Sequence, residues 1–313
     1  MLVLVAAALA TPTYSSFSKD PRDTLLADRA TPAGFRIIAL SHLAEACGAD
    51  GDVGCVERVA RAAVHPSIRP VDPNGRLADH GLYLSHLALI LGTCAAVGGS
   101  CDADLHRRVS EHLAARSVRD GVIASFPGEP RRYPADQAVT LRALQLYDST
   151  RGTDVLPGAL GAYRALVDAA TEASGWGLPP SELTGAEDWS SVPRGCALAS
   201  TVQYLAPVDP DYARQVWKRA KKQLYVQVGP VSGLREWPLG EEREADADSG
   251  PIVLGVGAAA TAFGIGAAYA MGDPVAVAQL EGTEWLVRKQ GHPAGDSALA
   301  VAISAASPRR SRE

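Results

Sequence analysis

The densest set of groups able to do acid–base chemistry lies in residues 235–251, REWPLGEEREADADSGP. This stretch holds six carboxylates, two arginines and one tryptophan, directly before a segment rich in Ala and Gly. Carboxyl groups in different environments can take the separate roles of general acid and general base. Whether they do so here depends on the elements that surround the stretch.

The acids of this stretch differ in their surroundings. Glu236 stands between Arg235 and Trp237, where partial burial would shift its pKa. Asp248 precedes Gly250 and a proline, a pattern that a helix N-cap explains as well as catalysis does. The other glutamates are expected to face solvent: Glu241, Glu242 and Glu244.

A second acid of interest is Asp136 in YPADQAVTLRALQLYD. It follows Pro134 by two residues, in the first turn of an expected helix. An acid is favoured at that place by the unpaired N–H groups of the helix end, so capping alone accounts for it as well as catalysis does.

Helical patterning dominates the chain, and no alternating strand of useful length is predicted. Apolar residues recur at helical spacing in segments such as GLYLSHLALILGTCAAV and YARQVWKRAKKQL. Short turns are expected near residues 48, 98, 149, 206 and 271, and longer loops alternate with them. This period of about 50 to 65 residues predicts five helical hairpins plus a final apolar segment, DSALAVAISAA. The predicted fold is all-α: a toroid of five to six hairpins with inner and outer helix layers.

The hairpin period and the loop asymmetry, with YPADQAVTLRALQLYD as an inner helix start, resemble the six-hairpin (α/α) toroid superfamily. That superfamily includes many glycoside hydrolases and polysaccharide lyases, and linalool dehydratase/isomerase-like proteins share the architecture. The resemblance concerns the fold, and a fold alone does not define a function.

If the hairpins stack in a ring, the long loops gather at the inner-helix N-termini and form one cleft. N-termini of helices favour anions and ionised acids. The expected catalytic residues are Asp136, Glu236 and Asp248. The expected substrate-binding residues are Tyr83, His86, Tyr133, Asp188, Trp189, Arg194, Trp237 and Asp246. Tryptophans in such loops suit a sugar-binding cleft, because sugars pack on aromatic faces.

Four of the five cysteines form two close pairs across turns, Cys47 with Cys55 and Cys94 with Cys101. Each pair fits a disulfide at the base of a helical hairpin, which requires an oxidising compartment. Free buried thiols in a cytosolic protein are the alternative. Cys196 is expected to be a free core residue rather than a nucleophile.

Residues 1–18 form either an export signal or an apolar N-terminal segment that could associate with a membrane. Residues 19–306 are expected to form the single toroid domain, and residues 307–313 a basic tail. The net charge of −5 does not favour a nucleic-acid partner. No metal or cofactor is expected. Gly255 and Gly257 match part of a dinucleotide-binding fingerprint, but the βαβ unit that such a site requires is not predicted.

These features predict an exported enzyme that acts on a carbohydrate through paired carboxylates. One alternative is a lyase or isomerase on a small apolar alcohol, with Tyr133, His86 or Cys196 in a dry pocket. Another is a non-catalytic scaffold whose cleft binds a glycan or a partner protein.

Overall fold

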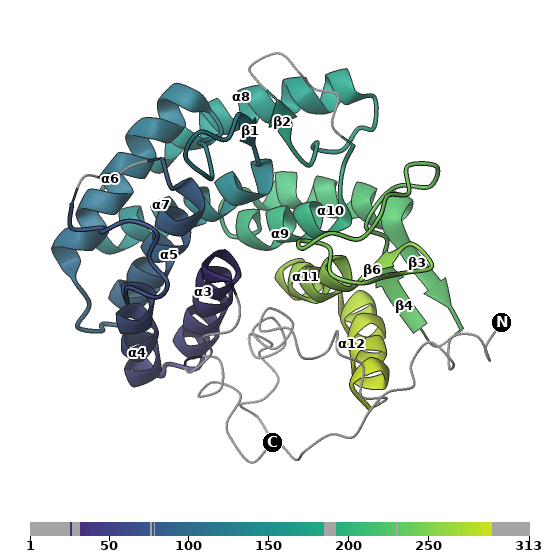
Figure 1. Ribbon diagram of the computed structural model, residues 1–313, viewed down its shortest axis with the longest axis horizontal. Helices are drawn as coiled ribbons and strands as arrows, with labels where there is room; N and C mark the ends of the chain where they lie inside the picture. The colour runs from purple at the N-terminus through teal and green to yellow at the C-terminus, as the bar shows by residue number, and fades with distance from the viewer. Residues whose placement is uncertain are drawn as a thin grey trace.

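The computed structural model describes residue 26 and residues 32–75, 77, 79–184, 192–229 and 231–289. Ten helices and three two-stranded antiparallel sheets lie in this part of the chain. Figure 1 shows the helices following one another around an arc, with consecutive helices paired. The predicted all-α hairpin architecture is confirmed.

The helices form two layers. The inner helices contact one another in sequence around the arc, α3 with α5, α5 with α7, α7 with α9 and α9 with α11. Their bounds are α3 (Ala33–Ala49), α5 (Gly81–Ala96), α7 (Pro134–Arg151), α9 (Gly195–Leu205) and α11 (Ala258–Ala270). The outer helices are α4 (Val53–Ala63), α6 (Ala103–Asp120), α8 (Leu156–Ser174), α10 (Pro210–Leu224) and α12 (Pro274–Lys289).

Sequence explains which helix takes which layer. Helix α5 is apolar on all sides and is buried over nearly its whole length, as expected for an inner helix. Helix α10 instead buries one stripe, which includes Val216 and Trp217, and exposes its lysines. Three outer helices start at an aspartate whose side chain accepts a backbone N–H bond: Asp52, Asp102 and Asp209. These caps end the short turns.

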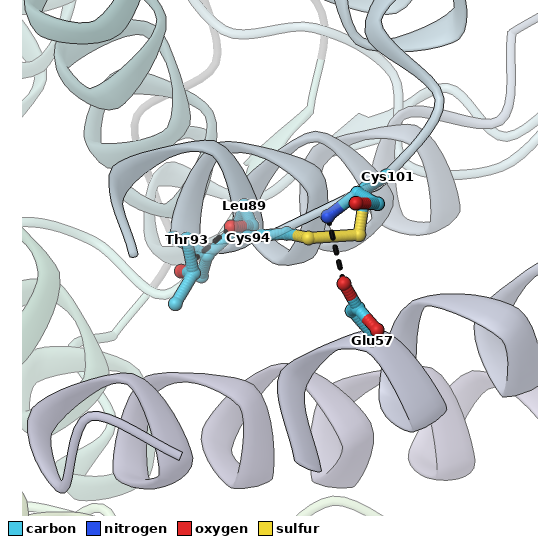
Figure 2. Close-up of a disulfide and its surroundings, with 6 residues drawn as sticks. Glu57, Leu89, Thr93, Cys94 and Cys101 are labelled. Carbon is cyan, nitrogen blue, oxygen red and sulfur yellow. Dashed lines mark hydrogen bonds between the residues drawn. A yellow bond between two sulfur atoms is a disulfide. The ribbon is translucent and has the colours of Figure 1, made fainter. Parts of the chain in front are cut away.

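The five short turns lie where the spacing predicted them, and contacts between neighbouring turns place them at one end. Glu57 of α4 accepts a hydrogen bond from the backbone of Ser100 in the next turn, at 2.8 Å, beside Cys101 (Figure 2). Arg164 of α8 pairs with Asp209 at 2.7 Å. These contacts tie the first hairpin to the second and the third hairpin to the fourth at this end.

Both expected disulfides are formed, Cys47–Cys55 and Cys94–Cys101, with S–S distances of 2.03 Å (Figure 2 shows the second). The first joins the two helices of the first hairpin, and the second stabilises the turn between α5 and α6 in the second hairpin. Disulfides persist in oxidising compartments, which indicates a location outside the cytoplasm. Cys196 is free and buried.

We expect thiol counting in denaturant without reductant to find one free thiol per chain, that of Cys196, and five after reduction. The measurement is a colorimetric titration of the purified exported protein. A count of five before reduction would contradict both the disulfides and the proposed compartment.

The long loops also contain three short antiparallel strand pairs that the helical pattern did not predict, and two of these pairs are hairpins. The pairs are β1 (Arg131–Arg132) with β2 (Leu183–Thr184), β3 (Tyr225–Val228) with β4 (Val231–Leu234), and β5 (Ile252–Val253) with β6 (Val256–Gly257). Leu254 and Gly255 both have positive φ, 53° and 79°, which is the backbone of a tight hairpin turn.

This last hairpin also corrects the expected N-cap at Asp248. Helix α11 begins only at Ala258, after Gly257, and has no side-chain cap. Asp248 lies ten residues earlier, in a turn at the loop end. It is therefore available for a role other than capping.

Among the described residues, no helix combines the length and the apolar character needed to cross a membrane. Segments 1–18 and 307–313 lie outside the described residues, and so does DSALAVAISAA.

Candidate functional site

Five expected site residues meet at the long-loop end, around the N-termini of α7, α9 and α11. Asp136 is the third residue of α7, and Arg194 directly precedes α9. Glu236 follows β4 closely, and Asp246 and Asp248 precede β5. Four separate segments of the chain thus contribute to one cluster.

Asp136 is the carboxyl group whose protonation the surroundings change most clearly in this cluster. Its Oδ2 accepts a hydrogen bond from Ser125 Oγ at 2.5 Å, which favours the ionised form. Loss of hydration and the negative charge of Asp248 outweigh that bond, and together they raise the pKa of Asp136 to about 6. A carboxyl group with this pKa can donate a proton near neutral pH.

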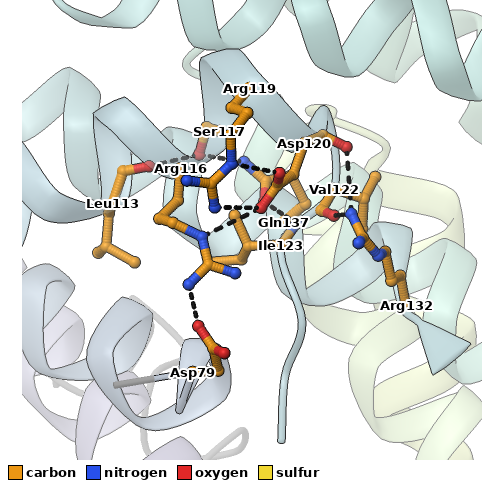
Figure 3. A network of polar contacts seen from close by, with 10 residues as sticks. All are labelled: Asp79, Leu113, Arg116, Ser117, Arg119, Asp120, Val122, Ile123, Arg132 and Gln137. Carbon is orange, nitrogen blue, oxygen red and sulfur yellow. Dashed lines mark hydrogen bonds and ion pairs between the residues drawn. The ribbon is translucent and has the colours of Figure 1, made fainter. Parts of the chain in front are cut away.

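A polar network fixes the loop that carries Ser125 (Figure 3). Gln137, the residue after Asp136, accepts a bond from Ile123 N at 3.1 Å and donates to Ser117 Oγ at 2.8 Å. Arg132 donates to Val122 O at 2.9 Å. Loop residues 121–125 are therefore held against both α6 and α7, and Ser125 is fixed opposite Asp136.

Asp248 lies at the exposed rim of the cluster, near Asp136. Reduced hydration raises its pKa, and the charge of Asp246 adds to this, while Arg194 and Arg131 oppose it. Two carboxyl groups that interact in this way tend to ionise in turn rather than together.

Arg194 connects the rim to the interior. Its Nη2 donates to Asp246 Oδ1 at 2.9 Å, and its Nε donates to Glu236 Oε1 at 2.8 Å. Partial burial disfavours ionisation of Asp246, but the hydrogen bonds from Arg194 and Ser249 leave its pKa below the usual range. Asp246 is therefore an ionised structural partner of the arginine.

Glu236 is fully buried, with 0% of its surface exposed. Its Oε1 accepts from both Arg194 and the thiol of Cys196, at 2.8 and 2.9 Å. Burial and the charge of Glu236 raise the pKa of the Cys196 thiol well above its usual value, so the thiol stays protonated. The expectation that Cys196 is a core residue fits this setting.

Two glycines allow this burial. An ideal Cβ at Gly195 would lie 2.1 Å from the Arg235 carbonyl oxygen, and one at Gly257 would lie 2.6 Å from Glu236 Oε2. Glycine lets the backbone approach at both places. Neither close approach can be predicted from a motif in the sequence.

Trp237 differs from the expected open platform. Only 7% of it is exposed, and the guanidinium groups of Arg194 and Arg243 each lie 4.7 Å from its ring centroid. Tyr133 is half-buried directly before α7, and burial raises its pKa. Tyr133 is therefore more exposed than Trp237, as the expected substrate-binding role requires.

Tyr83 and His86 are buried inside the helix layers and bond residues outside this cluster. Tyr83 is 3% exposed and its hydroxyl donates to Ala63 O at 3.2 Å. The Nδ1 of His86 is 2.7 Å from Ser41 Oγ. Asp188 and Trp189 lie outside the described residues.

Sequence reasoning missed a buried polar set next to His86. His42 Nε2 is 3.2 Å from the hydroxyl of Tyr204, and His42 Nδ1 is 3.3 Å from Gln203 Nε2. These contacts join α3 to α9 across 162 and 161 residues of sequence. No local signal predicts such a contact.

No group of three or more His, Cys, Asp or Glu side chains among the described residues is arranged to hold a metal ion. The expectation of no cofactor stays a prediction.

The paired helices, ordered as inner and outer layers with the long loops at one end, define the α/α-toroid class of fold. A solved structure described as D-mannose isomerase is similar to this chain, with a TM-score of 0.53 and 13% sequence identity. The similarity covers 79% of this chain and 74% of that one. At this identity the similarity shows the fold. No family profile matches the sequence, and no curated protein matches it.

Proposed function

We propose that this protein is an exported carbohydrate-active enzyme that cleaves glycosidic bonds. Asp136 protonates the leaving oxygen, and Asp248, as the ionised carboxylate, activates water or attacks the anomeric carbon. The observation that carries the proposal is the carboxyl group of Asp136, whose pKa of about 6 is raised in part by the neighbouring Asp248.

The charges of the cluster support an uncharged sugar as substrate. Glu236 and Asp246 pair with Arg194, and Arg194 and Arg131 act on Asp248. With Asp136, the acids of the cluster outnumber these two arginines. A second carboxylate on the ligand would be repelled by this excess of acids. Tyr133 at the start of α7 adds an aromatic face and a hydroxyl.

Isomerisation of a free sugar is a second candidate, and the fold similarity to D-mannose isomerase favours it. The base would take the proton from C2 of an open-chain aldose while the acid protonates O1. The resulting enediol would then give its O2 proton back to the deprotonated acid and take a proton at C1 from the protonated base, which yields the ketose. Asp248 would be the base and Asp136 the acid.

The test is a panel of neutral oligosaccharides and free aldoses. Ligands present at 100 times their dissociation constant stabilise the native state by about 2.7 kcal/mol, which raises the melting temperature by several degrees. NMR spectra of the reactions then separate the two candidates. Hydrolysis produces new reducing ends, whereas isomerisation in D₂O produces a different sugar with deuterium on carbon.

The matched control is Asp136→Asn, which is expected to keep the ligand-induced stabilisation and lose the reaction. If no sugar of either kind shifts the melting temperature or reacts, the proposed function is wrong, and the scaffold alternative gains support.

A further inference from the structure

We propose that Glu236, Arg194 and Asp246 form a positioning relay that places the carboxylate of Asp248 against Asp136. The relay rests on the proposed function, because it assigns these three residues no contact with substrate. It also changes the role expected for Glu236, from a reacting acid to a buried anchor.

The anchor is the first step of the relay. Glu236 is held on both sides through its backbone, since its carbonyl accepts from Gly195 N at 2.8 Å and its N–H donates to Gly255 O at 3.0 Å. Its side chain is completely buried and engages Arg194 and Cys196. A group enclosed in this way cannot reach a ligand, but it can fix a partner that does extend outward.

That partner is Arg194, the second step. Its side chain is 13% exposed, with Nε on the buried Glu236 and Nη2 on Asp246, which is 47% exposed. A guanidinium group holds two carboxylates in one plane with fixed directions, which an ammonium group does not do. Arg194 therefore fixes Asp246 at the rim relative to the buried Glu236.

Asp246 is the third step, and it controls the backbone of Asp248. Its Oδ1 accepts from Asp248 N at 3.0 Å and from Ser249 N at 2.8 Å, in addition to Arg194. Ser249 Oγ closes the turn by accepting from Asp246 N at 2.9 Å. These bonds set the direction in which Asp248 leaves the turn.

Asp248 interacts electrostatically with residues of the relay and with Asp136. Arg194, Asp246 and Arg131 all act on its pKa, and Asp248 in turn acts on the pKa of Asp136. Burial is the main cause of the raised pKa of Asp136, and the charge of Asp248 adds to it. A displacement of Asp248 should therefore change this pKa, which can be measured without any substrate.

The experiment is an NMR titration of protein labelled with ¹³C at the aspartate carboxyl carbons, with the Asp136 signal assigned by Asp136→Asn. Arg194→Gln and Asp246→Ala should lower the pKa of Asp136 by about half a unit or more, because the charge of Asp248 moves away. Glu236→Gln should have little effect, since the amide oxygen still accepts from Arg194.

The matched control is Arg243→Gln. Arg243 lies the same 4.7 Å from the Trp237 ring as Arg194 does, and it is exposed and makes no ion pair among the described residues. Its removal should leave the pKa of Asp136 within about 0.2 units.

An unchanged pKa in folded Asp246→Ala protein would overturn the relay, even if Arg194→Gln fails to fold. Activity gives the second readout. A loss of about 10²–10⁴-fold in turnover for Glu236→Gln, with the pKa of Asp136 unchanged, would identify Glu236 as a reacting acid rather than an anchor. If no sugar is turned over, the proposed function fails while the titration still tests the relay.

Discussion

Replacing Asp136 with Asn is expected to lower turnover of a sugar substrate by about 10²–10⁴-fold, because a positioned general acid contributes that much. The amide cannot supply the proton, although its oxygen can still accept from Ser125. In the wild type, turnover should fall as the pH rises through about 6, where Asp136 loses its proton. The measurement is a pH profile of kcat/KM for both proteins.

Asp136→Asn should raise the free energy of unfolding at pH 7. The direction of this change distinguishes a buried acid from a helix cap. The native pKa of Asp136 lies above its usual value, so folding favours the protonated form. The stability from this group is present below about pH 4 and is lost as the pH rises to about 6. Above that pH, Asn removes a penalty of roughly 1–2 kcal/mol, reduced here for partial exposure to solvent.

A helix cap would give the opposite result, a loss of about 0.5–1 kcal/mol at the same pH. Glu244→Gln serves as the control, because Glu244 lies in the same loop and is exposed. It should change neither turnover nor stability measurably. Equal effects of Asp136→Asn and Glu244→Gln would remove Asp136 from the mechanism.

Acid should destabilise the protein strongly between pH 6.5 and pH 4, because three histidines are buried in the neutral state. Burial lowers the pKa of His42 to about 4, of His86 to about 3 and of His106 to about 4. His42 also lies near His86, and Arg151 acts on His106. The unfolded chain takes up these protons near pH 6.5, whereas the native state does not.

Each such histidine costs about 1.4 kcal/mol of stability per pH unit below 6.5. The raised pKa values of Asp136 and Glu45 act in the opposite direction over part of this range. The net loss is on the order of 1–3 kcal/mol per pH unit, a large part of the 5–15 kcal/mol typical of a domain. Urea unfolding at pH 8, 6 and 5 measures it.

Replacing His106 alone tests the contribution of one buried histidine to this loss of stability in acid. Neither of its ring nitrogens has a hydrogen-bond partner among the described residues, and its ring packs edge-on against Tyr147, with centroids 5.3 Å apart. His106→Leu should keep or raise stability at pH 7 and reduce the acid slope by about 1.4 kcal/mol per pH unit. His65→Gln is the control, since His65 is exposed. An acid slope that is equal in all three proteins would show that His106 takes up its proton in the native state.

The sequence by itself determined the parts of this protein that depend on near neighbours. Apolar spacing predicted the helices. Aspartates such as Asp102 cap outer helices by accepting a hydrogen bond from the backbone N–H three residues later. The cysteine spacings of 8 and 7 residues fixed both disulfides. These features are local because a helix, a cap or a short turn forms among residues that the chain already holds together.

Tertiary structure decided how deep each loop acid lies and what it faces. Glu236 and Glu241 are five residues apart in one loop, yet one is fully buried and the other is half-exposed. Arg194 reaches Glu236 and Asp246 across 42 and 52 residues, and His42 reaches Tyr204 across 162. Such depths and contacts depend on how helices pack around the arc, and the loop sequence alone does not encode that packing. Loss of hydration raises the pKa of a carboxyl group such as that of Asp136. The fold therefore determines which of the loop acids can donate a proton near neutral pH.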